Sequence, residues 1–102
     1  MKEVFKNWET YAKKIKKVAK KILGDANVYG FGSVIRKKCT GSSDIDILIC
    51  SPSVPEKGLR RAEIIAEIRE KTKLPYEFEL HLLTLKKFKV YKKMFGKLKE
   101  IK

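Results

Sequence analysis

The spacing of apolar residues along the chain predicts three amphipathic helices. Apolar side chains recur every three or four residues within residues 4–23, within residues 56–73 and after Thr84, whose hydroxyl can cap a helix start. Gly24 ends the first of these segments and Pro75 the second. The residues expected to face the core are Val4, Phe5, Trp8, Tyr11, Ala12, Ile15, Val18, Ala19, Ile22 and Leu23, then Leu59, Ala62, Ile65, Ala66 and Ile68, then Leu85, Phe88, Tyr91, Phe95 and Leu98. Among the aromatic residues of this list, Trp8, Tyr11, Phe88 and Tyr91 are expected to be core residues rather than base-stacking platforms.

Shorter segments between these helices predict three strands. Residues 26–31 form a short strand that runs into Gly32-Ser33, followed by a candidate helical turn over residues 34–37. From Asp44 the chain alternates between two aspartates on one face and three isoleucines on the other, until Pro52 and Pro55 close the strand. Residues 76–83 alternate again, with Tyr76, Phe78, Leu80 and Leu82 on one face and Glu77, Glu79 and His81 on the other.

The order of these elements, αβαβαβα, predicts an α/β (α+β) fold with a small mixed β-sheet and helices packed mainly on its apolar face. The 102 residues match a single domain spanning residues 1–102. A content of 43% hydrophobic and 36% charged residues excludes a disordered chain. No segment resembles a membrane span or a signal peptide, so we expect a cytoplasmic protein. Cys39 and Cys50, with one histidine in the chain, cannot form a zinc cage and are expected to be reduced thiols.

The net charge of +13 lies in the two terminal segments. Residues 1–23 contain eight lysines and two acidic residues, residues 84–102 contain eight lysines and one acidic residue, and residues 24–83 contain nine of each sign. Most of these lysines have no carboxylate near them in sequence, which argues against ion-pair networks. The lysine faces are therefore either solvated or bind an anion such as RNA or another polyanion.

Carboxylates on two of the predicted strands indicate a cation site. If the strands are neighbours, Asp44 and Asp46 share one open face with Glu77, Glu79 or both, because strand rise places alternate Cα atoms about 6.6 Å apart and strands lie about 4.8 Å apart. Such a cluster is unfavourable unless a divalent cation neutralises it, and carboxylate oxygens favour Mg²⁺ or Mn²⁺ over zinc. Magnesium takes further ligands from phosphates, so these sites serve phosphoryl and nucleotidyl transfer.

Gly32-Ser33 supplies the complementary part of such a site. Free amides and a serine hydroxyl at a helix start can hold the terminal phosphates of a nucleoside triphosphate. The segment is neither a Rossmann fingerprint, which needs a third glycine, nor a P-loop, which needs Gly-Lys-Ser/Thr.

Phe31-Gly32-Ser33, ten intervening residues, Asp44-Ile45-Asp46-Ile47 and a later acidic strand together resemble the nucleotidyltransferase superfamily of DNA polymerase beta. Within that superfamily the chain is similar to the minimal nucleotidyltransferases, which consist of little beyond the catalytic palm. The resemblance covers about residues 26–83, where Arg36 and residues 41–43 also fit the pattern.

The resemblance implies roles for individual residues. Gly32 and Ser33 would hold the β- and γ-phosphates, and Asp44 and Asp46 would bind two metal ions, Mg²⁺ or Mn²⁺. Glu79 would be the third metal-binding and catalytic carboxylate, although aspartate is common there in the family. Glu77, two residues after Pro75, is the alternative. Three further assignments are more open: Ser43 would bind nucleotide, Arg36 would contact phosphate or solvent, and His81 would be a neutral side chain on the sheet face or would position a phosphate or carboxylate.

The implied function is transfer of a nucleoside monophosphate from a triphosphate, with ATP as the expected donor, to a hydroxyl by a two-metal mechanism. The resemblance further implies a HEPN-domain protein as partner in a toxin–antitoxin pair, and a homo-oligomer is the other expectation. Two alternatives remain open at this stage, a regulatory domain that binds a partner without catalysis and a basic nucleic-acid-binding module.

Overall fold

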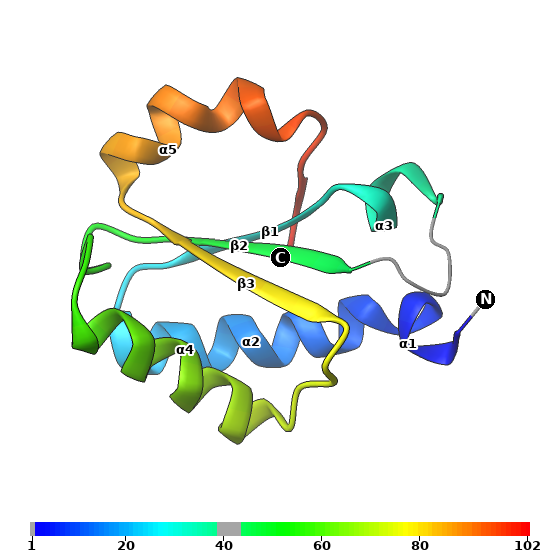
Figure 1. Ribbon diagram of the computed structural model, residues 1–102, viewed down its shortest axis with the longest axis horizontal. Helices are drawn as coiled ribbons and strands as arrows, with labels where there is room; N and C mark the ends of the chain where they lie inside the picture. Colours follow the sequence, from blue (N-terminus) through cyan, green and yellow to red (C-terminus); the bar gives the residue numbers. More distant parts are fainter. Residues whose placement is uncertain (1, 39–43) are drawn as a thin grey trace.

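A four-stranded mixed sheet organises the computed structural model, which describes residues 2–38 and 44–102 (Figure 1). The strand order is β3-β2-β1-β4, with β1 antiparallel to β2 and β4, and β2 parallel to β3. Along the chain the elements are α1 Glu3–Lys6, α2 Trp8–Leu23, β1 Asn27–Phe31, α3 Ser33–Arg36, β2 Ile45–Cys50, α4 Leu59–Thr72, β3 Phe78–Leu83, α5 Leu85–Tyr91, the 3₁₀ helix η1 Lys92–Phe95 and β4 Lys99–Glu100. The predicted mixed sheet covered by helices is confirmed.

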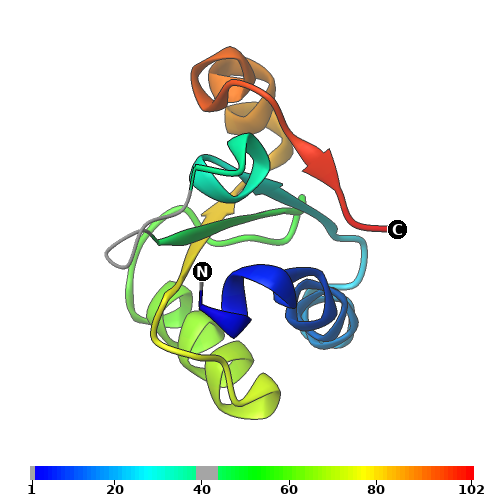
Figure 2. The ribbon, with the colours of Figure 1, turned by 90° about the vertical axis from the view of Figure 1, so that its right-hand side faces the viewer.

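Most of the core lies between the sheet and the helices α2 and α4. Ile45, Ile47 and Ile49 of β2 are fully buried on this side, as predicted, together with Ile15 and Ala19 of α2. The opposite face of the sheet is also partly covered, because α5 and η1 cross it (Figure 2). Leu48 and Cys50, which alternate with the isoleucines, are therefore buried as well. Burial raises the pKa of the Cys50 thiol, which is free; Cys39 lies outside the described residues.

The first predicted helix is divided in two at Asn7, whose φ of −103° and ψ of 14° separate α1 from α2. The helix ends at Gly24 as predicted, and Trp8 belongs to the core. Tyr11 is half-buried against Phe78, with ring centroids 5.4 Å apart.

The inward face predicted for α4 is confirmed for Ile68, which is buried, and for Ile65, which is half-buried against the core, but it is wrong for the other three residues. Leu59 is 76% exposed, and Ala62 and Ala66 are also exposed, whereas Ile64 and Ile68 are the buried residues. The apolar residues form a broad arc on the helix, so their spacing alone does not show which part of that arc is buried. Two arginines determine this instead, because their head groups bond to backbone carbonyls beside the sheet.

Arg61 and Arg69 bind the edge of the sheet. Arg61 donates to the carbonyls of Leu82 and Pro55, at 2.6 and 3.0 Å, and Arg69 donates to those of Phe78 and Pro75, at 2.9 and 3.2 Å. Successive carbonyls of a strand point to opposite sides, and those of Glu77 and Leu83 accept hydrogen bonds from the β2 side. The carbonyls of Phe78 and Leu82 therefore point away from β2, at the open edge of the sheet that β3 forms. The arginines therefore satisfy backbone groups that would otherwise be open to pairing with another chain.

The prediction of one last helix reaching Leu98 is also wrong. Thr84 caps α5 as predicted, accepting from the Lys87 amide at 3.2 Å, but the helix is short and buries none of its residues. Leu85 and Tyr91 are 41% and 42% exposed, so Tyr91 is not a core residue, while Phe88 is half-buried and stacks on Tyr29.

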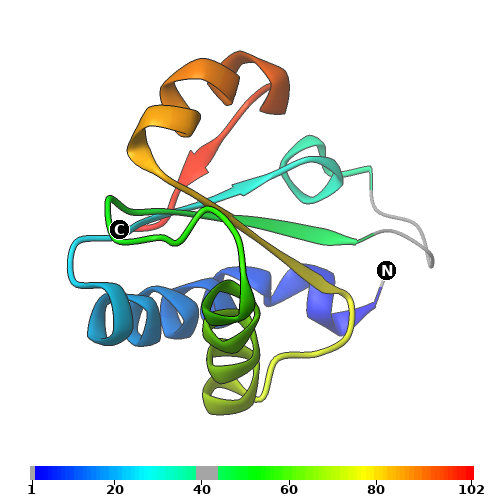
Figure 3. The same cartoon turned by 60° about the vertical axis from the view of Figure 1, so that its left-hand side comes forward.

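A short strand follows instead of a continued helix, lying beside β1 (Figure 3). Ile101 is 2% exposed, its amide donates to the Val28 carbonyl at 2.8 Å, and its own carbonyl accepts from Lys16 Nζ at 2.8 Å. Lys99 pairs with Glu9 of α2 at 2.9 Å. Burial of Ile101 and these contacts with α2 stabilise the strand pairing over further helix.

Candidate functional site

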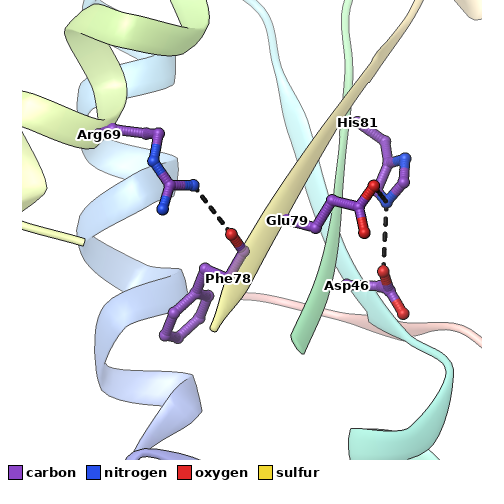
Figure 4. Close-up of polar contacts among 5 residues, drawn as sticks. All are labelled: Asp46, Arg69, Phe78, Glu79 and His81. Carbon is purple, nitrogen blue, oxygen red and sulfur yellow. Dashed lines mark hydrogen bonds and ion pairs between the residues drawn. The ribbon is translucent and has the colours of Figure 1, made fainter. Parts of the chain in front are cut away.

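One cross-strand row of the sheet brings two predicted site residues together. Phe31 of β1 lies opposite Asp46 of β2, and Asp46 lies opposite Glu79 of β3. Because residues in register point to the same face of a sheet, the two carboxylates lie side by side on the face that carries α5 (Figure 4). The Asp46 side chain is 23% exposed and that of Glu79 55%, so the pair is open to a ligand.

His81, the next residue on this face of β3, joins the pair. Its Nε2 is 3.3 Å from Asp46 Oδ1 and 4.0 Å from Glu79 Oε1. One ligand atom from each of the three residues lies within 4.8 Å of the others. The alternation of Glu79 and His81 indicated from the sequence that they share a face, but His81 was not among the predicted metal ligands.

Glu77, the alternative third carboxylate, lies elsewhere. It precedes β3, its Oε2 is 3.4 Å from Lys2 Nζ, and the residue is 8% exposed. Tyr76 is not part of the strand either and is 79% exposed, because a turn in which the Phe78 amide donates to the Pro75 carbonyl precedes β3. The geometry therefore places Glu79, rather than Glu77, beside Asp46.

Arg69 holds the start of β3 next to this row. Its guanidinium donates to the carbonyl of Phe78, the residue before Glu79 (Figure 4). A second bond, to Pro75, ties the same guanidinium to the turn that leads into the strand. Arg69 thus fixes the backbone from which the Glu79 side chain projects.

Gly32 connects the predicted phosphate-binding turn to the carboxylates. It lies between β1 and α3 with φ of 78° and ψ of −145°, and a Cβ built on it would be 2.7 Å from Asp46 Oδ2. Only a glycine leaves room for that carboxylate oxygen. Ser33 begins α3 and is half-buried, and the amides of Ser33 and Val34 have no partner within the helix because they belong to its first turn.

The remaining predicted site residues are less closely associated. Asp44 is exposed, precedes β2 and is not in the group formed by Asp46, Glu79 and His81. Arg36 ends α3 and is exposed. Ser43, like Gly41 and Ser42, lies outside the described residues.

The donor set fits a divalent cation. Ligands at neighbouring positions of an octahedral ion with bonds of about 2.1 Å lie about 3 Å apart, and opposite ligands about 4.2 Å apart. His81 Nε2 is 3.3 Å from Asp46 Oδ1, close to the separation of neighbouring ligands, and 4.0 Å from Glu79 Oε1, close to that of opposite ligands. Asp46, Glu79 and His81 can therefore reach one common ion.

Known proteins resemble this chain in sequence and in fold. The family model for the nucleotidyltransferase domain matches residues 12–101. The crystal structure of an inferred nucleotidyltransferase superposes on this chain with a TM-score of 0.69 and 33% sequence identity. The match covers 88% of this chain and 96% of the other. A 1.40 Å structure of another inferred nucleotidyltransferase, from Sulfolobus solfataricus, resembles the chain in fold, with a TM-score of 0.66 and 22% identity over 96% of this chain and 82% of the other.

No significant match to this chain is found among curated proteins. Among the described residues, no helix is long and apolar enough to cross a membrane. The family match spans most of the chain and includes the row formed by Phe31, Asp46 and Glu79. The chain therefore belongs to the nucleotidyltransferase domain family.

Proposed function

We propose that the protein transfers a nucleoside monophosphate from a nucleoside triphosphate, with ATP as the expected donor, to a hydroxyl group and releases pyrophosphate. The observation that carries this proposal is the position of Asp46. Its side chain lies beside Glu79 of the neighbouring strand and against the backbone of Gly32. A triphosphate bound at the Gly32-Ser33 turn would therefore lie next to both carboxylates.

Each part of the site has a role in the proposed reaction. The free amides after Gly32 and the Ser33 hydroxyl hold the β- and γ-phosphates, with Arg36 and Ser43 as further phosphate contacts. Asp44, Asp46 and Glu79 hold two divalent cations, Mg²⁺ or Mn²⁺. Cations bound there would neutralise triphosphate charge and acidify the attacking hydroxyl. The hydroxyl oxygen bonds to the α-phosphorus, the bond from that phosphorus to the α–β bridging oxygen breaks, and Glu79 is placed to accept the proton.

The acceptor hydroxyl is proposed to belong to a partner protein, of the HEPN-domain type in a toxin–antitoxin pair, or to a second copy of this chain. The similarity to minimal nucleotidyltransferases supports the first choice. α5 and η1 lie on the same face of the sheet as the site, since Phe95 packs on Phe31 with ring centroids 4.9 Å apart. Val90 and Met94 on these helices are 67% and 77% exposed and offer apolar surface to a partner.

Binding and turnover can be tested together. A non-hydrolysable ATP analogue with Mg²⁺ or Mn²⁺ should raise the melting temperature, because a ligand at about 100 times its Kd adds about 2.7 kcal/mol of stability, roughly 10 to 20 °C for a domain of this size. Asp44→Asn combined with Asp46→Asn should abolish this shift without unfolding the protein. With labelled ATP and candidate acceptors, the wild type should transfer label and release pyrophosphate. An undiminished shift in the double variant would place the site elsewhere, and binding without transfer to any acceptor would favour a regulatory domain.

A separate observation favours a second function, the binding of a polyanion such as RNA. Lys14, Lys17 and Lys21 of α2 line a groove of about 450 Å³ with Lys71 of α4, on the side of the sheet opposite the candidate site. Within the part of the chain that the structure describes, the first three of these lysines have no carboxylate partner, while Lys71 pairs with Glu67 at 2.8 Å. The pKa of Glu67 is lowered by that bond.

We expect a triple change of Lys14, Lys17 and Lys21 to glutamine to weaken RNA binding and to reduce its salt dependence. Each lost phosphate contact with a single strand should lower the slope of log affinity against log salt by about 0.7, so three contacts should lower it by about 2. A matched change to glutamine of Lys86 and Lys89 on α5 and of Lys92 on η1 removes the same charge from the other face of the sheet. Equal losses in both variants would indicate non-specific attraction, and no binding at about 50 mM salt would leave the lysines as a solvated face.

A further inference from the structure

The imidazole of His81 lies where a metal ligand would lie. We propose that His81 Nε2 binds the same divalent cation as Asp46 and Glu79, and that this nitrogen makes the site prefer Mn²⁺ to Mg²⁺. The proposal rests on the proposed function in one respect, that these two carboxylates form a cation site.

One nitrogen of His81 faces two carboxylates. Nε2 is 3.3 Å from Asp46 Oδ1 and 4.0 Å from Glu79 Oε1. A single N–H can donate along one direction only, and 3.3 Å is at the long end of hydrogen-bond distances. A lone pair on the same nitrogen directed at a cation between the three groups satisfies all of them together, at separations typical of ligands around one ion.

The residues around His81 hold the imidazole ring in this orientation. His81 packs against Phe31, with ring centroids 5.2 Å apart and a tilt of 55°, and Phe31 is in turn held by Phe95. The backbone is fixed as well, because Arg69 and Arg61 bond to the carbonyls of Phe78 and Leu82 on either side of Glu79 and His81. A ligand held in place before the metal arrives loses little conformational freedom on binding.

Divalent cations differ in their affinity for an imidazole nitrogen. Mg²⁺ is a hard ion that binds oxygen and gives up its waters reluctantly, whereas first-row transition ions accept imidazole nitrogen readily. Mn²⁺ also retains the octahedral geometry and affinity for carboxylates that the rest of the site supplies. One nitrogen in a carboxylate site should therefore shift the preference from Mg²⁺ towards Mn²⁺.

The sequence makes a direct test practicable, because His81 is the only histidine in the chain. Mn²⁺ bound to untagged protein can be examined by pulsed EPR, in which ¹⁴N modulation from an imidazole ligand can come only from this residue. The measurement is made on the metal alone and again with inorganic tripolyphosphate, which contains no nitrogen. Affinities for Mn²⁺ and Mg²⁺ are measured by calorimetry on the same samples, so no step depends on catalysis.

We expect ¹⁴N modulation in the wild type and its loss in His81→Gln. Groups that only hydrogen-bond to metal ligands typically change affinity 10- to 100-fold, so loss of a direct ligand should weaken Mn²⁺ binding at least about tenfold. Mg²⁺ affinity should change less than about threefold. Glu77→Gln, which removes a carboxylate outside the group, should retain both the modulation and the affinity.

Two results would overturn the proposal. The first would remove only the role of His81, and the second would also remove the cation site. Mn²⁺ binding that is lost in Asp46→Asn but shows no ¹⁴N modulation in the wild type would leave the carboxylate site standing without His81. The absence of Mn²⁺ and Mg²⁺ binding in the wild type, with or without tripolyphosphate, would remove the cation site of the proposed function as well. Circular dichroism shows whether the His81→Gln variant is folded. If the variant is unfolded, the ¹⁴N modulation in the pulsed EPR spectrum of the wild type still decides whether His81 binds the metal.

Discussion

Replacing Glu79 with glutamine should lower the rate of nucleotide transfer at least about 100-fold, which corresponds to about 2.7 kcal/mol of activation free energy. Glutamine preserves the size of the side chain but removes the negative charge beside Asp46 on the neighbouring strand. A group that accepts a proton or stabilises charge in the transition state affects turnover more than ground-state binding. Triphosphate affinity, measured by calorimetry, should therefore change only a few-fold, because Ser33 and Asp46 are intact.

Glu77→Gln is the matched control, since it removes the same charge two residues away. Glu77 is turned away from the site, 8% exposed and paired with Lys2 at 3.4 Å. We expect this variant to retain turnover and to lose at most some thermal stability. The reverse pattern, with activity lost in Glu77→Gln and kept in Glu79→Gln, would assign catalysis to Glu77. Equal rates in both variants and the wild type would remove the third carboxylate from the mechanism.

The strands of the site could be predicted because they have a period of two. In Asp44 to Ile47 and in Phe78 to Leu82, alternation separates the polar from the apolar face. Once β2 and β3 are neighbours, the facing of Asp46 and Glu79 follows from their register. Alternation alone assigns Glu77 and Glu79 to the same polar face, so the sequence favoured Glu79 only because Glu77 lies two residues after Pro75, near the start of the strand. The turn after Pro75 and the contact with Lys2 separate them, and both depend on the folded chain.

The helices were harder to orient than the strands. The apolar residues of α4 form a broad arc, and the part of it that is buried is selected by Arg61 and Arg69, whose bonds to β3 join residues up to 21 positions apart. β4 has two residues, too few for a recognisable alternation, and is held by Ile101 against Val28. In both cases, tertiary contacts that the local pattern does not contain determine the structure.

The same distinction applies to His81. Its shared face with Glu79 could be read from their spacing, but its 3.3 Å approach to Asp46 requires the packing of Phe31 against the imidazole. Phe31 was predicted only as the end of a strand next to Gly32-Ser33. The aromatic contact that it makes with the histidine joins β1 to β3 across β2, and only the register of all three strands shows it.

Replacing Gly32 with alanine should abolish metal-dependent stabilisation and lower nucleotide transfer at least about 100-fold, while the protein remains folded. The backbone conformation, with φ of 78° and ψ of −145°, should cost alanine about 1–3 kcal/mol. The new Cβ would also lie 2.7 Å from Asp46 Oδ2. Because that oxygen ends a short side chain that can rotate, relief of the overlap costs little stability but moves the carboxylate away from Glu79. The defect should therefore appear in metal binding and turnover rather than in unfolding.

Gly96→Ala separates backbone strain from the contact with Asp46. Gly96 has nearly the same conformation, with φ of 69° and ψ of −140°, and nothing lies within 4 Å of a Cβ built on it. Both variants should lose a similar amount of thermal stability, roughly 4–8 °C for each kcal/mol of strain in a domain of this size. Only Gly32→Ala should lose the rise in melting temperature with Mn²⁺ or Mg²⁺ and the transfer of nucleotide. If Gly32→Ala retained both responses at the level of Gly96→Ala, the approach of the Gly32 backbone to Asp46 would have no part in the site, and the observation that carries the proposed function would fail.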